Sequence, residues 1–274
     1  MKIAKPESLE TLGFVARVFV QASIPHRSVK SNEYIRQNGD YTLTMMAPSS
    51  VGLPYGATPR LLLAWLTTEV QRTRDRELDL GDSIAGFMRQ LGMPATSGKR
   101  GSVVRLKDQM HRLLGCLFRW DMNGASDWGH VTIADGQHTK LWWDSNDAEQ
   151  IALFRSVIVL SEAFYTESLY NAVPVDFDVM RALNRSPMAL DIYTWLTHRV
   201  CNLKRPTNIP WGLLQEQFGA GYPETSRGRA DFRTNFLKQL GEVRQHYSAV
   251  KAGEGNGGLI IKPSLTHIPK KLIG

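Results

Sequence analysis

Two clusters of cationic and amide side chains follow short basic stretches of the sequence. The first cluster lies within residues 99–112 and the second within residues 227–238. Arginine can pair with the edge of guanine, asparagine with the edge of adenine and threonine with the methyl group of thymine, while lysine neutralises phosphates. Residues 227–238 hold four basic groups and one acidic group, whereas a solvated helix face usually balances the two. These side chains could therefore bind and read double-stranded DNA.

Each cluster fits the outward face of an amphipathic helix. At about 100° per residue, the apolar side of the first helix consists of Val103, Leu106, Met110, Leu113, Leu114 and Leu117. The apolar stripe of the second helix consists of Phe232, Phe236, Leu240 and Val243. Lys99 and Arg100 precede the first helix, where the positive end of its dipole also favours phosphate. The candidate DNA-binding residues are Lys99, Arg100, Arg105, Gln109, Arg112, Arg227, Arg229, Arg233, Thr234, Asn235 and Lys238.

The two clusters belong to two copies of an internal repeat. TPRLLLAWLTTE aligns with MALDIYTWLTHR, which places Trp65 over Trp195 at an offset of 130. Downstream, Leu113 aligns with Leu240 at an offset of 127. An offset that shifts only once indicates duplication of one unit. The two tryptophans lie among apolar residues and are expected in the core.

Each copy predicts the same order of elements. A first helix, over about 59–74 and 187–202, is followed by a short extended entry and a second helix, over about 82–91 and 210–218. The third helix carries a basic cluster, and hairpin-like sequence follows it, with GEGNGG (253–258) as a turn. This is the order of a winged helix-turn-helix, whose third helix normally enters the major groove. The predicted fold class is α+β, with two winged helix-turn-helix domains in tandem; for either copy alone, an unrelated helical pair with a sheet is the alternative.

The net charge of +7 is unevenly distributed along the chain. Residues 1–118 carry 16 basic and 10 acidic groups, residues 119–176 carry 3 and 9, and residues 177–274 carry 14 and 7. The basic blocks coincide with the two repeated units, so the acidic block between them should face away from DNA. Chance drift of surface charge is the alternative interpretation.

The composition is that of a soluble globular chain. Of 274 residues, 42% are hydrophobic and 22% charged, which argues against disordered and collagen-like architectures. The only two cysteines, Cys116 and Cys201, argue against a disulfide framework and a zinc knuckle. No signal peptide or membrane span is recognisable. We expect a cytoplasmic protein with no cofactor and no membrane partner.

The sequence contains no catalytic pattern, so the chain is predicted not to be an enzyme. Its seven histidines never occur as His-x-His, the spacing expected for the metal site of a DNA-nicking protein. Gly-x-Ser-x-Gly, His-Glu-x-x-His and a nucleotide-binding loop are absent. Asp79 and Asp82 are interpreted as N-capping residues of the second helix. Trp142 and Trp143 are neighbours in a predicted strand, so their rings point to opposite faces of it. The ring that points outward could stack on the bases of single-stranded nucleic acid, and this alternative stays open.

Several long motifs resemble the plasmid-encoded RepA family of replication initiators, of the kind found on broad-host-range plasmids. The most specific is GLPYG (52–56) followed by PRLLLAWLTTE, and SPMALDIYTWLTHR is similar to the same family. The resemblance runs from about Phe14 through Arg199. The remaining C-terminal part matches by architecture more than by motif.

The resemblance implies an initiator that binds direct repeats, called iterons, at a plasmid origin and recruits a host initiator and helicase. An N-terminal winged-helix domain (1–160) would serve dimerisation and auxiliary DNA contact, and a C-terminal one (161–274) would supply the main sequence-specific binding. Monomers in equilibrium with homodimers would activate replication, while dimers would repress the gene and limit plasmid copy number. The alternative is a dimeric winged-helix transcriptional repressor without initiator activity.

Overall fold

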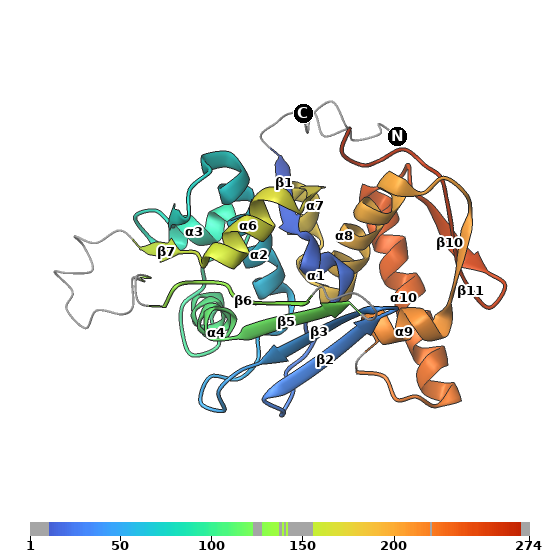
Figure 1. Cartoon of the computed structure of the whole chain (residues 1–274), viewed down its shortest axis with the longest axis horizontal. Coiled ribbons are helices and arrows are strands. Elements are labelled where there is room, and N and C mark those ends of the chain that lie inside the picture. Colours follow the sequence, from blue (N-terminus) through green and yellow to red (C-terminus); the bar gives the residue numbers. More distant parts are fainter. Residues whose placement is uncertain are drawn as a thin grey trace.

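The chain is a mixed α/β protein with several small antiparallel sheets (Figure 1). The computed structural model describes residues 11–122, 128–136, 139, 141, 156–219 and 221–269. Trp142, Trp143 and part of the acidic block 119–176 lie outside the described residues. Among the residues that are described, no helix is both long and apolar enough to cross a membrane.

The first repeated unit contains the three expected helices. They are α2 (Ala57–Thr73), α3 (Ile84–Gln90) and α4 (Ser102–Leu114), with strand β4 (Glu77–Asp79) after α2. Leu106, Met110 and Leu113 of α4 are buried, as the periodicity predicts. Leu117 is a correction: α4 ends at Leu114 with Gly115 as its C-cap, so Leu117 begins a strand and is not part of the helical stripe.

The start of α3 corrects a second expectation. The Ser83 hydroxyl accepts a hydrogen bond from the Gly86 N–H at 3.1 Å and is the N-cap. Asp79 instead accepts from the Gly81 N–H at 2.7 Å and closes the turn before the helix. The capping oxygen must face the N–H three residues ahead. Ser83 has that spacing, whereas Asp79 and Asp82 both lie upstream of the N-cap, so neither caps α3 as expected.

The second repeated unit has the same order of elements. Its helices are α8 (Pro187–Asn202), α9 (Trp211–Phe218) and α10 (Ser226–His246), with strand β9 (Thr207–Pro210) after α8. The predicted hairpin follows as β10 (Lys251–Gly255) and β11 (Gly258–Lys262), and the sheet order is β10-β11-β9. The predicted apolar stripe of α10 is confirmed, since all four of its members are buried.

The strands of the first unit form two sheets. One has the order β2-β3-β5-β6, and its members are β2 (Glu33–Asn38), β3 (Tyr41–Met46), β5 (Leu117–Met122) and β6 (Trp128–Thr132). The other pairs β4 with β7 (Val157–Val159). Residues just beyond β6 flank β7 on its other side, because Asp135 N–H donates to the Val159 carbonyl at 2.8 Å and Ser161 N–H to the Ile133 carbonyl at 3.1 Å. The order 133–135, β7, β4 matches the order β10, β11, β9 of the second unit.

Equivalent tryptophans pack alike in the two units. Trp65 meets Phe87 edge to face with ring centroids 4.9 Å apart, and Trp195 meets Phe218 edge to face at 5.3 Å. Both tryptophans are 4% exposed, which confirms that they belong to the core. In each unit the ring of the first helix packs on the second helix.

A pair of strands joins the two units at the centre of the molecule. Strand β1 (Leu12–Ala16) pairs antiparallel with β8 (Ala172–Asp176), and each leads directly into a short helix, α1 (Arg17–Gln21) or α7 (Phe177–Ala182). Helix α6 (Glu162–Tyr170) is fastened to α2, because the Gln71 amide donates to the carbonyls of Ser168 and Leu169 at 2.7 and 2.8 Å. These contacts cross residue 160, and the domain boundary proposed there stays a prediction.

A buried ion pair connects the first helices of the two units. The guanidinium of Arg60 (α2) donates two hydrogen bonds, of 2.6 and 2.7 Å, to the carboxylate of Asp191 (α8). His26 Nε2 lies 2.7 Å from the same carboxylate. Arg60 and Asp191 are only 6% and 8% exposed. The remaining Arg60 N–H groups donate to the carbonyls of Ile24, Pro25 and Gly56.

The protonation states of this cluster follow from its surroundings. Burial by itself raises the pKa of Asp191, but the Arg60 charge and the hydrogen bonds from His26 and Arg60 outweigh burial and lower the pKa. Burial lowers the pKa of His26 below its ordinary value of 6.5, against the opposing effect of Asp191. At neutral pH the carboxylate is ionised and the imidazole neutral, so His26 donates from Nε2. All buried polar groups of the cluster are therefore paired.

Candidate nucleic-acid interface

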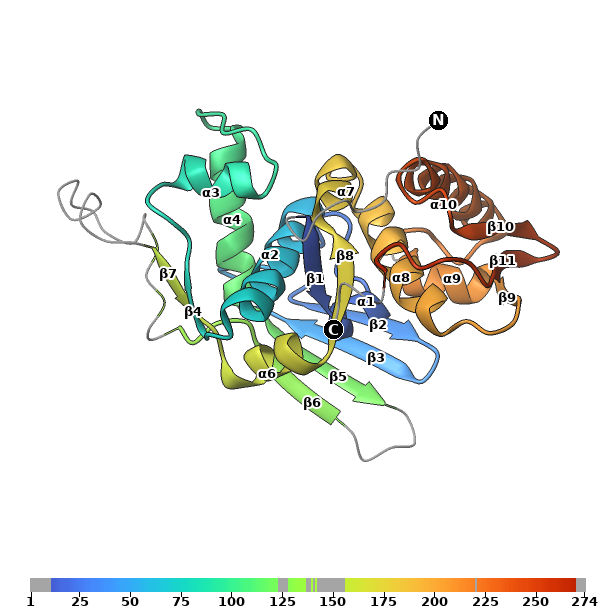
Figure 2. The ribbon, with the colours of Figure 1, turned by 90° about the horizontal axis from the view of Figure 1, so that it is seen from above.

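A cleft of about 1170 Å³, here called the inter-helix cleft, separates α4 from α10. Arg105 and Asp108 of α4 line one side, Lys238 and Glu242 of α10 line the other, and residues 181–187 lie between them. Figure 2 shows α4 and α10 on the two sides of α7, with α6, β5 and β6 at the opposite edge of the molecule. The described part of the acidic block contributes no residue to this cleft.

The loop before α4 is closed by hydrogen bonds across its base. The Ser102 N–H donates to the Thr96 hydroxyl at 2.9 Å, and the Thr96 N–H donates to the Ser102 hydroxyl at 2.9 Å. Lys99 and Arg100 lie at the exposed tip of this loop, directly ahead of the helix as predicted. The closed base limits the loop's freedom, so the two cations are held close to the positive end of the α4 dipole.

The outward face of α4 is narrower than the sequence predicts. Arg105 is exposed, while Arg112 is half-buried and paired with Asp108, its Nε 2.9 Å from Oδ1. Gln109 is a correction, because it is 5% exposed and its Oε1 accepts a hydrogen bond from the Tyr55 N–H at 2.8 Å. Gln109 lies beside the buried Met110 on the helix, and its side chain faces the chain that precedes α2. Gln109 therefore holds α4 against that chain, and only a small part of its side chain is exposed where it lines the inter-helix cleft.

The GLPYG motif holds that preceding chain against α4. Gly52 and Gly56 have φ of +74° and +81°, which favours glycine at both positions. A Cβ at Gly52 would lie 2.3 Å from Arg112 Nη1, and the Arg112 guanidinium lies 5.6 Å from the centre of the Tyr55 ring. Together with the Tyr55 hydrogen bond to Gln109, these contacts fix the face that α4 presents.

Replacement of Gly52 by alanine tests this role. We expect the free energy of unfolding to fall by about 1–2 kcal/mol from the left-handed backbone alone. A further loss of about 0.5 kcal/mol is expected because the Arg112 guanidinium must move away from Asp108. Gly39→Ala is the matched control, since Gly39 has φ +58° and nothing within 4 Å of its Cβ position. Urea unfolding of both variants separates the two effects. Equal losses would contradict the packing role of Gly52.

Helix α10 presents a strip of three predicted residues to solvent. Thr225 caps the helix by accepting a hydrogen bond from the Gly228 N–H at 3.1 Å. Arg227, Thr234 and Lys238 are exposed and lie within about 40° of one another around the helix. Arg227 is only loosely paired with Asp231, at 3.9 Å. This strip is the part of α10 that is best placed to face the major groove of DNA.

The other predicted residues of α10 face its flanks. Arg229 is exposed near the helix start. Arg233 is paired with Glu254 of β10 at 2.5 Å, so in this structure it ties the helix to the hairpin. Asn235 is half-buried, with Nδ2 3.4 Å from Met188 Sδ and its Oδ1 accepting from Gln239 at 3.3 Å. Reading by Arg233 or Asn235 would require these contacts to open.

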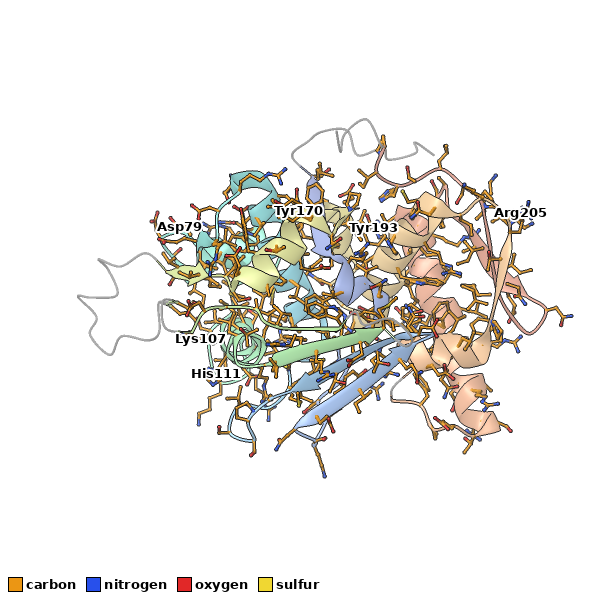
Figure 3. All side chains as sticks on the ribbon, in the orientation of Figure 1. Asp79, Lys107, His111, Tyr170, Tyr193 and Arg205 are labelled. Carbon is orange, nitrogen blue, oxygen red and sulfur yellow. The ribbon has the colours of Figure 1, made fainter. Side chains whose placement is uncertain are left out.

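The basic side chains of the two units are spread along the molecule. Figure 3 shows Lys107 and His111 on α4 at one end of the long axis and Arg205, just before β9, at the other. Within the described ranges, no group of three or more His, Cys, Asp or Glu side chains is placed to hold a metal ion. The cleft is lined by guanidinium, ammonium, amide and hydroxyl groups, which bind phosphates and base edges, and also by the carboxylates of Asp108 and Glu242.

Residues 53–211 match the family model of the plasmid encoded RepA protein. The chain belongs to this RepA family. The match begins within the GLPYG motif, contains α2, α4 and α8, and ends at the first residue of α9. Membership supports a role in the initiation of plasmid replication and in DNA binding. No curated protein sequence matches the chain.

Two solved structures share the fold of this RepA-family chain. The crystal structure of RctB domains 2-3 (RctB-155-483) superposes with a TM-score of 0.51 at 13% sequence identity and covers 89% of this chain and 96% of that chain. The structure of a selenomethionine derivative of RctB domains 2 and 3 gives a TM-score of 0.56 at 12% identity, with 92% and 99% covered. At such low identity the likeness concerns the arrangement of the elements alone.

Residues 181–187 of this RepA-family chain line the cleft between the third helices, a position that no motif in the sequence predicts. The segment reads RALNRSP, and its Ser-Pro pair is typical of a helix start. That signal predicts α8 correctly. It carries no information about where the preceding turn lies relative to α4 and α10.

Proposed function

We propose that the chain is a non-enzymatic, double winged-helix protein that initiates plasmid replication by binding direct repeats at the plasmid origin. The observation that carries the proposal is that α4 and α10, each with exposed cations, border a single cleft in a chain of the RepA family. DNA-binding helices that flank one open surface can enter successive major grooves on one side of a duplex.

The winged-helix interpretation rests on element order and sheet order. Each unit contains a helix, a strand, two more helices and two later strands that pair beside the first strand. In the first unit, β5 and β6 of the other sheet come between the third helix and those two strands. In the first unit the wing would be formed by 133–135 and β7, and in the second by β10 and β11. The shared tryptophan packing supports duplication of one ancestral unit.

Division of labour between the units follows from their exposed side chains. Lys99, Arg100 and Arg105 supply phosphate contacts in the first unit, while the strip Arg227, Thr234 and Lys238 offers both phosphate and base contacts in the second. Linking two modest binding units raises the overall affinity through effective concentration. The second unit would therefore provide most of the sequence reading and the first would add affinity.

The regulatory part of the proposal comes from the family. The chain would act in the bacterial cytoplasm, recruit a host initiator and helicase, and repress its own gene. A monomer would bind repeats, and a homodimer would limit copy number. No metal or cofactor is assigned to this activity.

Footprinting of the full-length protein on the DNA that flanks its own gene tests the function. Several tandem copies of one site of ~20 bp, about two helical turns each, are expected for an initiator. A single palindrome would instead indicate a dimeric transcriptional repressor. Metal-dependent nicking of supercoiled plasmid would overturn the non-enzymatic assignment.

A further inference from the structure

The turn between α7 and α8 forms a ridge between two clefts. Arg185, Ser186 and Pro187 line the inter-helix cleft and also a second cleft of about 790 Å³, which lies between β2 and α10. The turn therefore reaches the surface between the two third helices. The turn is separate in sequence from the third helices α4 and α10 and from the hairpin β10–β11.

Hydrogen bonds to the first unit, at the end of α3, hold the turn in place. The Arg181 Nε donates to the Gln90 carbonyl at 3.0 Å, and the Asn184 amide donates to the Gly92 carbonyl at 3.4 Å. On its other side, the Ser186 hydroxyl caps α8 by accepting from the Ala189 N–H at 3.2 Å. The α7–α8 turn is thus fixed to the end of α3 and to the start of α8.

Arg185 is exposed at this fixed position and has no hydrogen-bond or ion-pair partner among the described residues. Two other arginines on the elements around the cleft are paired internally. Arg181 pairs with Asp178 at 2.5 Å, and Arg112 pairs with Asp108 at 2.9 Å. An unpaired guanidinium with no acidic partner is available to an anion without first breaking an internal contact.

We propose that Arg185 contacts the phosphate backbone of DNA between the two grooves entered by α4 and α10. Helices in successive major grooves leave one crossing of the backbone and minor groove facing the protein between them. The α7–α8 turn is the element that the structure places there. Because the turn is fixed to both units, a phosphate held by Arg185 would set the spacing of the two helices along the duplex. This inference rests on the proposed function.

The test measures binding of full-length Arg185→Gln to a duplex that carries one origin repeat, by fluorescence anisotropy over a series of salt concentrations. We expect affinity to fall by about tenfold, and the slope of log affinity against log salt to become shallower by about one. The loss should be similar for specific and unrelated duplexes. Arg185→Lys should retain most of the slope. Arg89→Gln is the matched control, since Arg89 is exposed on α3 and does not line the inter-helix cleft.

A second measurement locates the contact on the DNA. In a duplex whose central phosphates are replaced by neutral methylphosphonates, Arg185→Gln and the unchanged protein should bind equally. A persistent difference on that duplex, or a loss confined to the specific sequence with an unchanged salt slope, would overturn the backbone assignment.

Two further variants, Arg105→Ala and Lys238→Ala, separate a failure of the Arg185 contact from a failure of the proposed DNA-binding function. Normal binding by Arg185→Gln, with weakened binding by Arg105→Ala and Lys238→Ala, would reject the Arg185 contact alone. If all three variants bound as the unchanged protein does, the DNA-binding surface itself would be wrong.

Discussion

Asp191→Ala is expected to lower the free energy of unfolding by about 3–5 kcal/mol, because it leaves the Arg60 guanidinium buried without its counter-charge. Arg60 is 6% exposed, and two of its hydrogen bonds end on Asp191. His26 would lose the same acceptor. The loss would be measured by urea unfolding at neutral pH, where Asp191 is ionised.

A double variant and a surface variant serve as controls for Asp191→Ala. In Arg60→Leu/Asp191→Leu both charges are removed, so part of the loss should be recovered, since a buried ion pair and an apolar pair of similar volume are often nearly equivalent. The rest of the loss should remain, because the carbonyls of Ile24, Pro25 and Gly56 lose the donors that Arg60 supplies. Asp231→Ala removes an exposed carboxylate whose arginine partner lies 3.9 Å away, and should change stability by no more than about 0.5 kcal/mol. A small effect of Asp191→Ala would mean that the two units are not held together at this point.

Arg227→Ala/Lys238→Ala is expected to weaken DNA binding by about a hundredfold, as the loss of two charge-assisted contacts predicts. Both side chains are exposed on the same strip of α10, and Lys238 also lines the inter-helix cleft. If both contact phosphates, the slope of log affinity against log salt should become shallower by about two. The measurement is anisotropy with the full chain and a duplex that carries one repeat.

The matched control removes the same charge elsewhere. Arg72 lies at the end of α2 and Arg119 on the outer face of β5, and neither lines the inter-helix cleft. Arg72→Ala/Arg119→Ala should therefore bind nearly as the unchanged protein does. Similar losses in both double variants would show that net charge, and not the α10 strip, governs binding.

Helix positions and apolar stripes could be predicted from the sequence because they depend on local periodicity. The periodicity predicts the first helix of the second unit over 187–202, and the helix spans Pro187–Asn202. The stripe of α10 and the buried positions of Trp65 and Trp195 also agree with the structure. The same pattern occurs in both units, which one chance resemblance would not produce. The RepA resemblance is likewise confirmed, over residues 53–211.

The partners of the candidate site could not be predicted in the same way. Gln109 lies on the helical face that the periodicity assigns to solvent, yet the chain around Tyr55 covers it. The helical face predicts that Arg233 contacts DNA, yet Arg233 is paired with Glu254 from the following hairpin. In each case a segment far along the chain supplies the contact, and a helical wheel contains no information about such segments.

The family, the repeated order of helices and the cationic character of the third helices could all be predicted from the sequence, because each follows from residue types at short spacing. The sequence did not show which cations remain unpaired, or that α4, α10 and Arg185 border one surface. Burial and ion pairing depend on contacts between residues that are distant in sequence. The strand pair β1–β8 and the Arg60–Asp191 ion pair fix those contacts by joining the two units.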